Sequence, residues 1–160
     1  MESLNPSDPK MITRLLAALP KEFEFYHLGK VKLQEAALAS PRPDFFPAAS
    51  EDQVPAIGYS FRGDVTGVLI LGVPGGADLS VYAELGNIIA SQIATQLATQ
   101  DGLDVMISAP NFLSSSALRK LVSGGTHIES RTYLHHLDQA AIAISAWIVP
   151  STFDAAARNV

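Results

Sequence analysis

Two polar residues three positions apart, Glu84 and Asn87, are the residues of this sequence best placed to do chemistry. A carboxylate pairs with cations, whereas a carboxamide accepts one hydrogen bond while it donates another. Side chains three positions apart point the same way on a helix, so one rigid element could present both. This pair is the strongest indication of function in the chain.

The pair belongs to a long amphipathic segment that we expect to form a helix from the N-cap Asp78 to about Thr99, ending at Asp101–Gly102. At 100° per residue, one stripe is polar and holds Ser80, Glu84, Asn87, Ser91 and Thr95. The opposite stripe is apolar and holds Tyr82, Leu85, Ile89, Ile93 and Leu97. Solvated helix faces usually carry several charged pairs, yet this polar stripe has one charged residue, so we expect it to meet something other than water.

The remaining pattern mixes strands and helices. We expect a short helix over 10–19, strands over 30–34 and 104–108, a short helix over 114–122, and two hairpins, 56–61 with 65–73 and 127–137 with 140–149. The last strand is apolar on both faces and should be central in the sheet. Residues 1–9 should be a loose lead-in and the proline-rich 40–55 a long loop. The tight connections favour an α+β fold with a largely antiparallel sheet packed against the long helix.

Composition limits the classes of function. The chain has 160 residues, of which 48% are hydrophobic and 17% charged, so we expect one globular domain over 1–160. It has no cysteine, which excludes disulfides and thiolate chemistry and suits a reducing cytoplasm. A net charge of −5 disfavours nucleic acid and anionic membranes as partners. We expect no signal peptide and no membrane span, because the longest apolar run, 140–149, is far shorter than a bilayer needs.

The spacing of the motif resembles that of a known family. Ser80, Glu84 and Asn87 follow the pattern Asp or Ser, three residues, Glu, two residues, Asn, and Pro110 comes 22 residues later. This pattern, with Glu84-Leu85-Gly86-Asn87 as a block, resembles the CheC/CheX-type chemotaxis phosphatases. A single copy of the motif is closer to the CheX-like branch. One difference is the short connection 74–77 before the helix, where that branch usually has another helix.

The resemblance implies a phosphatase that hydrolyses the aspartyl phosphate of a CheY-like response-regulator receiver domain. Asn87 would hold a water in line with the phosphorus, and Glu84 would pair with the partner's active-site lysine. Ser80, Ser91 and Pro110 are expected to bind the partner, with Ser80 a contact or helix-end residue and Pro110 shaping the strand end beside the helix. The phosphatase needs no cofactor of its own, because the receiver domain supplies the divalent metal. The family also suggests a homodimer.

Two other interpretations remain open. The chain could be a non-catalytic module of the same fold that binds receiver domains or flagellar switch proteins, or an unrelated α+β domain with an unknown ligand.

Other residues that attract attention are better explained by structure than by function. His127, His135 and His136 do not suit one metal site, because neighbours on a strand face opposite ways. Phe23, Phe25 and Tyr26 should pack in the core.

Overall fold

The structure is a computed structural model, and it describes residues 14–15, 17–26, 29–39, 54–73, 76–124, 128–137 and 140–150. Its strands are β1 (Glu22–Phe25), β2 (Gly29–Ala39), β3 (Ala56–Gly63), β4 (Gly67–Gly72), β5 (Val105–Ile107), β6 (Asn111–Leu113), β7 (Ile128–Leu137) and β8 (Ala140–Pro150). Its longer helices are α2 (Leu79–Asp101) and α3 (Ser115–Gly124). The expected lead-in 1–9 and residues 40–53 of the expected loop lie outside the described residues.

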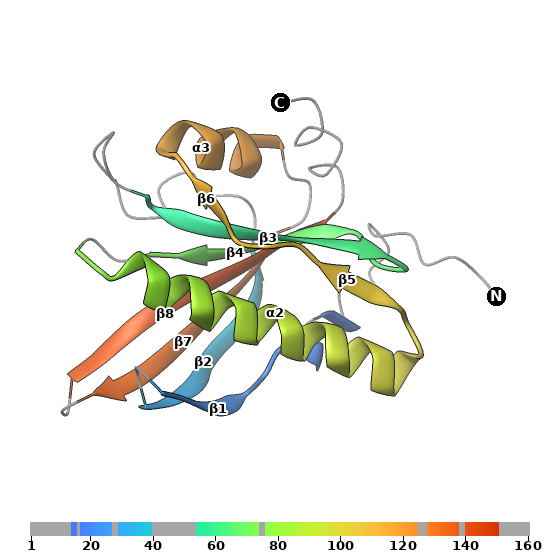
Figure 1. Ribbon diagram of the computed structural model, residues 1–160, viewed down its shortest axis with the longest axis horizontal. Coiled ribbons are helices and arrows are strands. Elements are labelled where there is room, and N and C mark those ends of the chain that lie inside the picture. The colour runs from blue at the N-terminus through green and yellow to red at the C-terminus, as the bar shows by residue number, and fades with distance from the viewer. Residues whose placement is uncertain are drawn as a thin grey trace.

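The strands form one antiparallel sheet in the order β1-β2-β7-β8-β4-β3-β5, with β6 also paired to β3 (Figure 1). The expected α+β fold is confirmed, with both hairpins present as β3–β4 and β7–β8. Strand β8 lies between β7 and β4, so the prediction that this apolar strand is central is also confirmed. Of the helix expected over 10–19, residues 14, 15, 17 and 18 are helical, and 10–13 and 16 are outside the described part.

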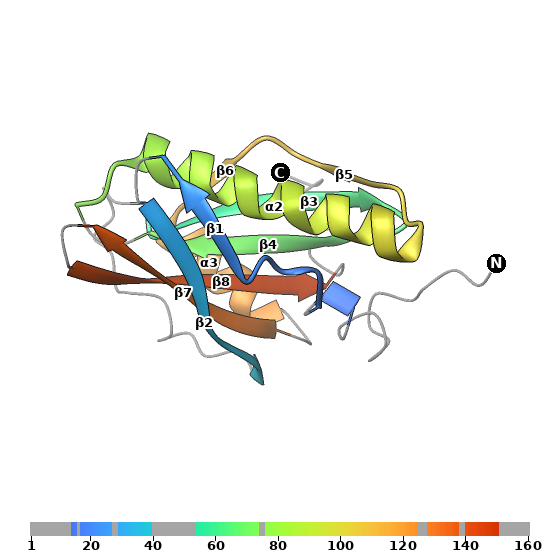
Figure 2. The same ribbon diagram turned by 90° about the horizontal axis from the view of Figure 1, so that it is seen from below.

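The two helices cover opposite faces of the sheet, as the two perpendicular views show (Figures 1 and 2). Alternate residues of β3 and β4 point to each face because the side chains of a strand alternate. Tyr59, Phe61 and Leu69 join the larger cluster beneath α2, whereas Val68 and Ile70 join a smaller cluster with α3. Strand β3 is therefore buried on both sides and directly supports α2.

Helix α2 begins and ends at the residues that the sequence predicts. The Asp78 carboxylate caps its start and accepts a hydrogen bond of 3.0 Å from the Ser80 amide. Gly102 has φ 65°, a left-handed conformation that favours glycine, and its amide donates to the Ala98 carbonyl at 3.1 Å. All five residues of the apolar stripe are buried, which confirms the predicted orientation of the helix.

The short strands β1 and β6 were not expected, and Tyr26 does not lie where the sequence predicts it. Strand β1 places Phe25 in the core, but Tyr26 follows at the turn into β2 and is 94% exposed, so the prediction that Tyr26 packs in the core is wrong. Adjacent side chains face opposite ways at a strand end, so burial of Phe25 turns Tyr26 outward. Beyond Pro110 the chain pairs with β3 again, as β6.

Within the part that the structure describes, no helix is both long and apolar enough to cross a membrane.

Candidate functional site

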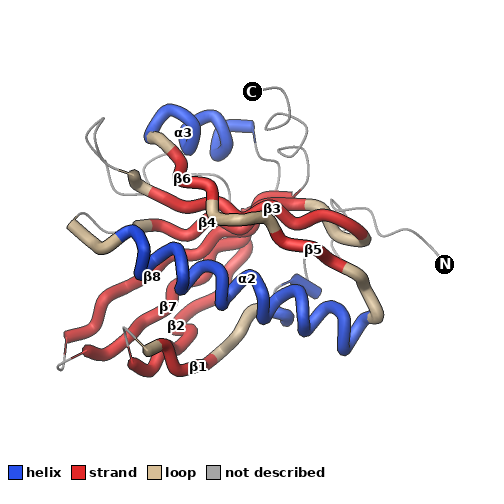
Figure 3. The backbone as a smooth tube through the Cα atoms, in the orientation of Figure 1, coloured by secondary structure: helices blue, strands red, loops and turns tan. Residues whose placement is uncertain are grey.

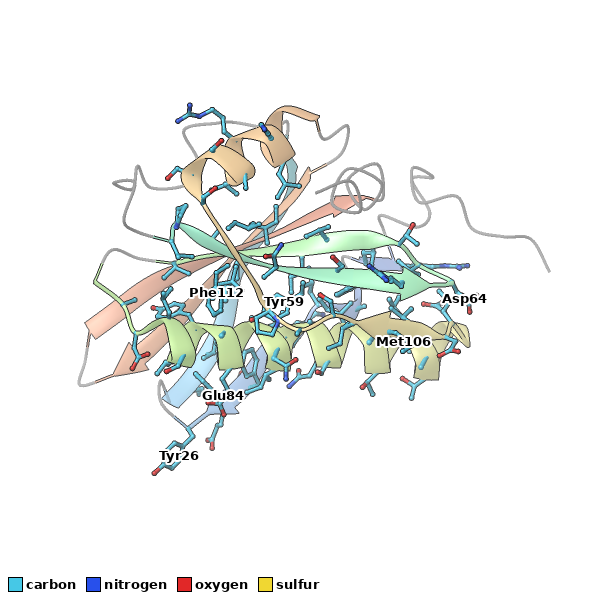
Figure 4. All side chains as sticks on the ribbon, turned by 45° about the horizontal axis from the view of Figure 1, so that its top comes forward. Tyr26, Tyr59, Asp64, Glu84, Met106 and Phe112 are labelled. Atoms are coloured by element: carbon cyan, nitrogen blue, oxygen red, sulfur yellow. The ribbon has the colours of Figure 1, made fainter. Side chains whose placement is uncertain are left out.

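The centre of the candidate site is one turn of α2. Glu84 and Asn87 are both exposed, and the two residues between them, Leu85 and Gly86, are buried. Figure 4 shows Glu84 projecting from the side of α2 opposite Tyr59 and β3. The helix begins at Leu79, before this turn, and continues to Asp101 after it, so its packing on the sheet holds the turn that presents the carboxylate and the carboxamide.

Tyr59 of β3 supports this turn from inside the protein. Its side chain is fully buried between the sheet and α2 (Figure 4), and its hydroxyl donates a hydrogen bond to the Ala83 carbonyl oxygen. Burial raises the pKa of the Tyr59 phenol well above its usual range, and the nearby backbone amide of Asn87 offsets part of that rise. Sequence reasoning missed Tyr59, because nothing local connects residue 59 to residue 87.

The raised pKa of Tyr59 predicts a loss of stability at alkaline pH. The unfolded phenol ionises near pH 10, whereas the folded phenol stays protonated, so the free energy of unfolding should fall as pH rises above about 10. One such proton contributes a slope of about 1.4 kcal/mol per pH unit. Tyr82 is also buried with a raised pKa, and contributes in the same direction. Urea unfolding at a series of pH values should therefore show a shallower alkaline decline for Tyr59→Phe than for the wild type; parallel curves would contradict this prediction.

Pro110 lies on the loop between β5 and β6, which runs along β3 (Figure 3). Ser108 fastens this loop: its amide donates to the Ser60 carbonyl oxygen at 2.9 Å, and its hydroxyl accepts from the Ser60 amide at 2.9 Å. Ser60 follows Tyr59, so adjacent residues of β3 hold the motif turn and the loop that carries Pro110. Pro110 itself is exposed. The structure thus brings the neighbourhood of the distant proline to the same stretch of β3 as the Glu84–Asn87 turn.

The two predicted serines lie elsewhere along α2. Ser80 is exposed at the start of the helix, and its hydroxyl donates to the Asp78 carboxylate at 2.7 Å, which fits the expected place at a helix end. Ser91 is half-buried one turn beyond Asn87. It lines a hollow of about 660 Å³ together with residues 17–22 and the polar side chains Gln92, Thr95, Gln96 and Gln100. Ser80 and Ser91 therefore extend the polar stripe to either side of the central turn.

The described residues contain no group of three or more histidine, aspartate or glutamate side chains that could hold a metal ion. The acidic residue of the motif, Glu84, thus has no metal-ligating cluster around it in this part of the chain. What the arrangement offers is hydrogen bonding and one negative charge on an exposed, supported helix turn.

The segment that carries the motif is similar to a known family. Residues 79–114 match the family described as CheC-like. The chain resembles the CheC-like family. This segment contains Ser80, Glu84, Asn87, Ser91 and Pro110, and the resemblance predicted from their spacing is confirmed. A search of curated proteins found no significant match.

Solved structures extend the likeness to the whole fold. FliY from Thermotoga maritima is 13% identical with a TM-score of 0.53, and the match covers 92% of this chain and 92% of that chain. The FliM middle domain from Vibrio alginolyticus is 10% identical with a TM-score of 0.51, covering 94% of this chain and 89% of that chain. The CheX–CheY complex from Borrelia burgdorferi matches at 15% identity over 94% of this chain and 98% of that chain, but its TM-score of 0.43 adds nothing to the argument. This chain therefore shares its fold with FliY and the FliM middle domain.

Proposed function

We propose that this protein is a phosphatase that hydrolyses the aspartyl phosphate of a CheY-like receiver domain. The observation that carries the proposal is the exposure of Glu84 and Asn87 on one supported turn of α2, inside the segment that matches the CheC-like family. The single copy of the motif supports a protein of the CheX-like branch. A receiver domain as partner implies a cytoplasmic setting.

The chemistry needs little from the phosphatase. An aspartyl phosphate is an acyl phosphate, and the receiver domain supplies the divalent metal and a lysine near the phosphoryl group. The carboxamide of Asn87 accepts a hydrogen bond from a water and donates one to a phosphoryl oxygen, which holds the water in line with the phosphorus. The water oxygen bonds to phosphorus as the bond to the aspartyl oxygen breaks, which gives inorganic phosphate and a free carboxylate. The proton that the water loses passes to phosphate or solvent.

The other predicted residues act in docking. Glu84 pairs with the lysine of the receiver domain and sets the position of Asn87 within its active site. Ser80 and Ser91 contact the partner before and after the central turn, and Pro110 shapes the loop beside it. An acceleration of ten- to hundredfold corresponds to about 1.4–2.7 kcal/mol of transition-state stabilisation, which one ordered water can supply.

A second function is compatible with the same fold, because the structural likeness includes the FliM middle domain. On that alternative, the polar stripe of α2 binds a receiver domain or a flagellar switch protein without hydrolysis. Phosphate release separates the two proposals. Receiver domains encoded in the same genome are phosphorylated with a small phosphodonor and mixed with the wild-type protein. Release faster than spontaneous decay supports the phosphatase, whereas a stable complex with unchanged release supports the binding module.

Glu84→Ala should weaken docking. Loss of the carboxylate removes the partner of the receiver lysine, so the Kd for the phosphorylated receiver domain should rise at least tenfold, about 1.4 kcal/mol. Titration calorimetry or fluorescence anisotropy, with a stable mimic of the phosphoryl group on the receiver domain, measures the change. Gln92→Ala is a matched control, since it also truncates an exposed polar side chain of α2. Equal affinities for wild type and Glu84→Ala would remove Glu84 from the interface.

A further inference from the structure

We infer that Tyr59 is a positioning residue for this site, because its hydroxyl holds the turn of α2 from which Glu84 and Asn87 project. The effect of Tyr59 on the rate of phosphate release rests on the proposed function. The effect of Tyr59 on the rigidity of the turn is expected whether the protein is a phosphatase or a binding module.

The hydroxyl is bonded to the backbone of the turn that carries the motif. It donates to the carbonyl oxygen of Ala83, and that carbonyl belongs to the peptide unit immediately before the Cα of Glu84. The end of the ring also packs against Gly86, the residue immediately before Asn87. The Ala83 carbonyl and the Asn87 amide are also the acceptor and donor of one helical turn. A single buried side chain thus constrains the backbone from which both functional side chains leave the helix.

Gly86 makes this contact possible. A Cβ atom at position 86 would lie 2.4–2.6 Å from the far end of the Tyr59 ring and its hydroxyl, closer than real side chains approach. Only a residue without a side chain lets the ring reach the helix backbone here. Gly86 is fully helical and buried, so its place in the Glu84-Leu85-Gly86-Asn87 block has a packing reason, not a conformational one.

The support behind the hydroxyl is rigid. Tyr59 lies on β3, pairs with Leu69 of β4 and is fully buried, together with Ile57 and Phe61 on the same face. The next residue, Ser60, holds the loop that carries Pro110. Strand β3 is therefore a common base for the two parts of the motif. Water positioning is sensitive to such support, since a displacement of about 1 Å can cost on the order of 100-fold in rate.

Tyr59→Phe tests the inference, because it removes the hydroxyl and keeps the ring. We expect kcat for phosphate release to fall about three- to tenfold with little change in KM, since the interface remains but the water is held less well. Tyr82→Phe is the matched control: it removes the hydroxyl of a second buried tyrosine, on the buried face of α2 itself, and kcat should stay within about 1.5-fold of wild type. A fall in kcat of the same size in both variants would overturn the positioning role.

Amide hydrogen exchange tests the same inference without an enzymatic assay. In Tyr59→Phe, the Ala83 carbonyl loses its hydrogen bond from the hydroxyl, so the turn is held less well. The Asn87 amide, which pairs with that carbonyl in the helix, should therefore exchange about five- to tenfold faster than in wild type, while the Ile93 amide six residues later is unchanged. Equal acceleration at both amides would show general destabilisation and would reject the inference. If wild type shows no phosphate release, the proposed function fails, but the exchange result still decides the role of Tyr59. If Asn87→Ala lowers release and Tyr59→Phe changes neither kcat nor exchange, this inference alone fails.

Discussion

Replacing Asn87 by alanine is expected to reduce phosphate release from a phosphorylated receiver domain to its spontaneous rate, a loss of about ten- to hundredfold. The side chain is exposed on a supported turn of α2, so its removal leaves the core intact. What disappears is the carboxamide that holds the water. Glu84 remains to pair with the receiver lysine, so Kd should stay within about threefold of wild type. Stopped-flow phosphate detection measures the rate, and anisotropy measures Kd.

Gln92→Ala is the control for general effects of truncating a polar residue on α2, and it should release phosphate at the wild-type rate. The free energy of unfolding of Asn87→Ala should match that of wild type within about 0.5 kcal/mol, as surface substitutions usually do. Unchanged phosphate release in Asn87→Ala would exclude Asn87 from the chemistry. Parallel loss of binding and release would assign Asn87 to docking instead.

Replacing Gly86 by alanine is expected to destabilise the protein by about 1–3 kcal/mol. In an ordinary helix interior the same change stabilises by about 0.5–1 kcal/mol, because glycine has the greater conformational entropy to lose. Here the sign reverses, since the new methyl group would overlap the Tyr59 ring end at 2.4–2.6 Å. The ring is buried and its hydroxyl is bonded to the helix, so it cannot move aside freely. Urea unfolding followed by circular dichroism measures the difference.

Two further variants isolate the cause. Ala94→Gly, at a half-buried position of the same helix, should destabilise the protein by about 1 kcal/mol. This control measures how much α2 favours alanine over glycine where no tyrosine ring is in the way. In a Tyr59→Leu background, where the end of the ring is gone, Gly86→Ala should be neutral or stabilising. A destabilisation of the same size in both backgrounds would show that Tyr59 is not what Gly86 avoids.

Much of the fold follows from local patterns. The apolar residues of α2 recur with the period of a helix, and Asp78 and Gly102 mark its ends, so its span and its buried face are predictable. The continuous apolar run of β8 predicts a central strand. Strand β1 and the exposure of Tyr26 were not predictable, because four residues before a turn carry too little periodicity.

The candidate site, too, is predictable from the sequence only in part. The spacing of Glu84 and Asn87 and the distance to Pro110 are visible in the sequence, and the match of residues 79–114 to the CheC-like family confirms the family resemblance predicted from that spacing. The roles of these residues in hydrolysis and docking stay predictions. Ser108 had no motif to identify it, yet its paired contacts with Ser60 hold the loop before Pro110.

The amino-acid order alone determines which side chains α2 turns toward solvent, because neighbours on a helix face are three or four residues apart and any helix there must group them. It also determines that Glu84 and Asn87 emerge together. Only the tertiary structure decides what holds their backbone. Tyr59 and Ala83 are 24 residues apart, and they meet because the pairing of β3 and the packing of α2 on the sheet bring the hydroxyl to Gly86, the one position in that turn that leaves it room.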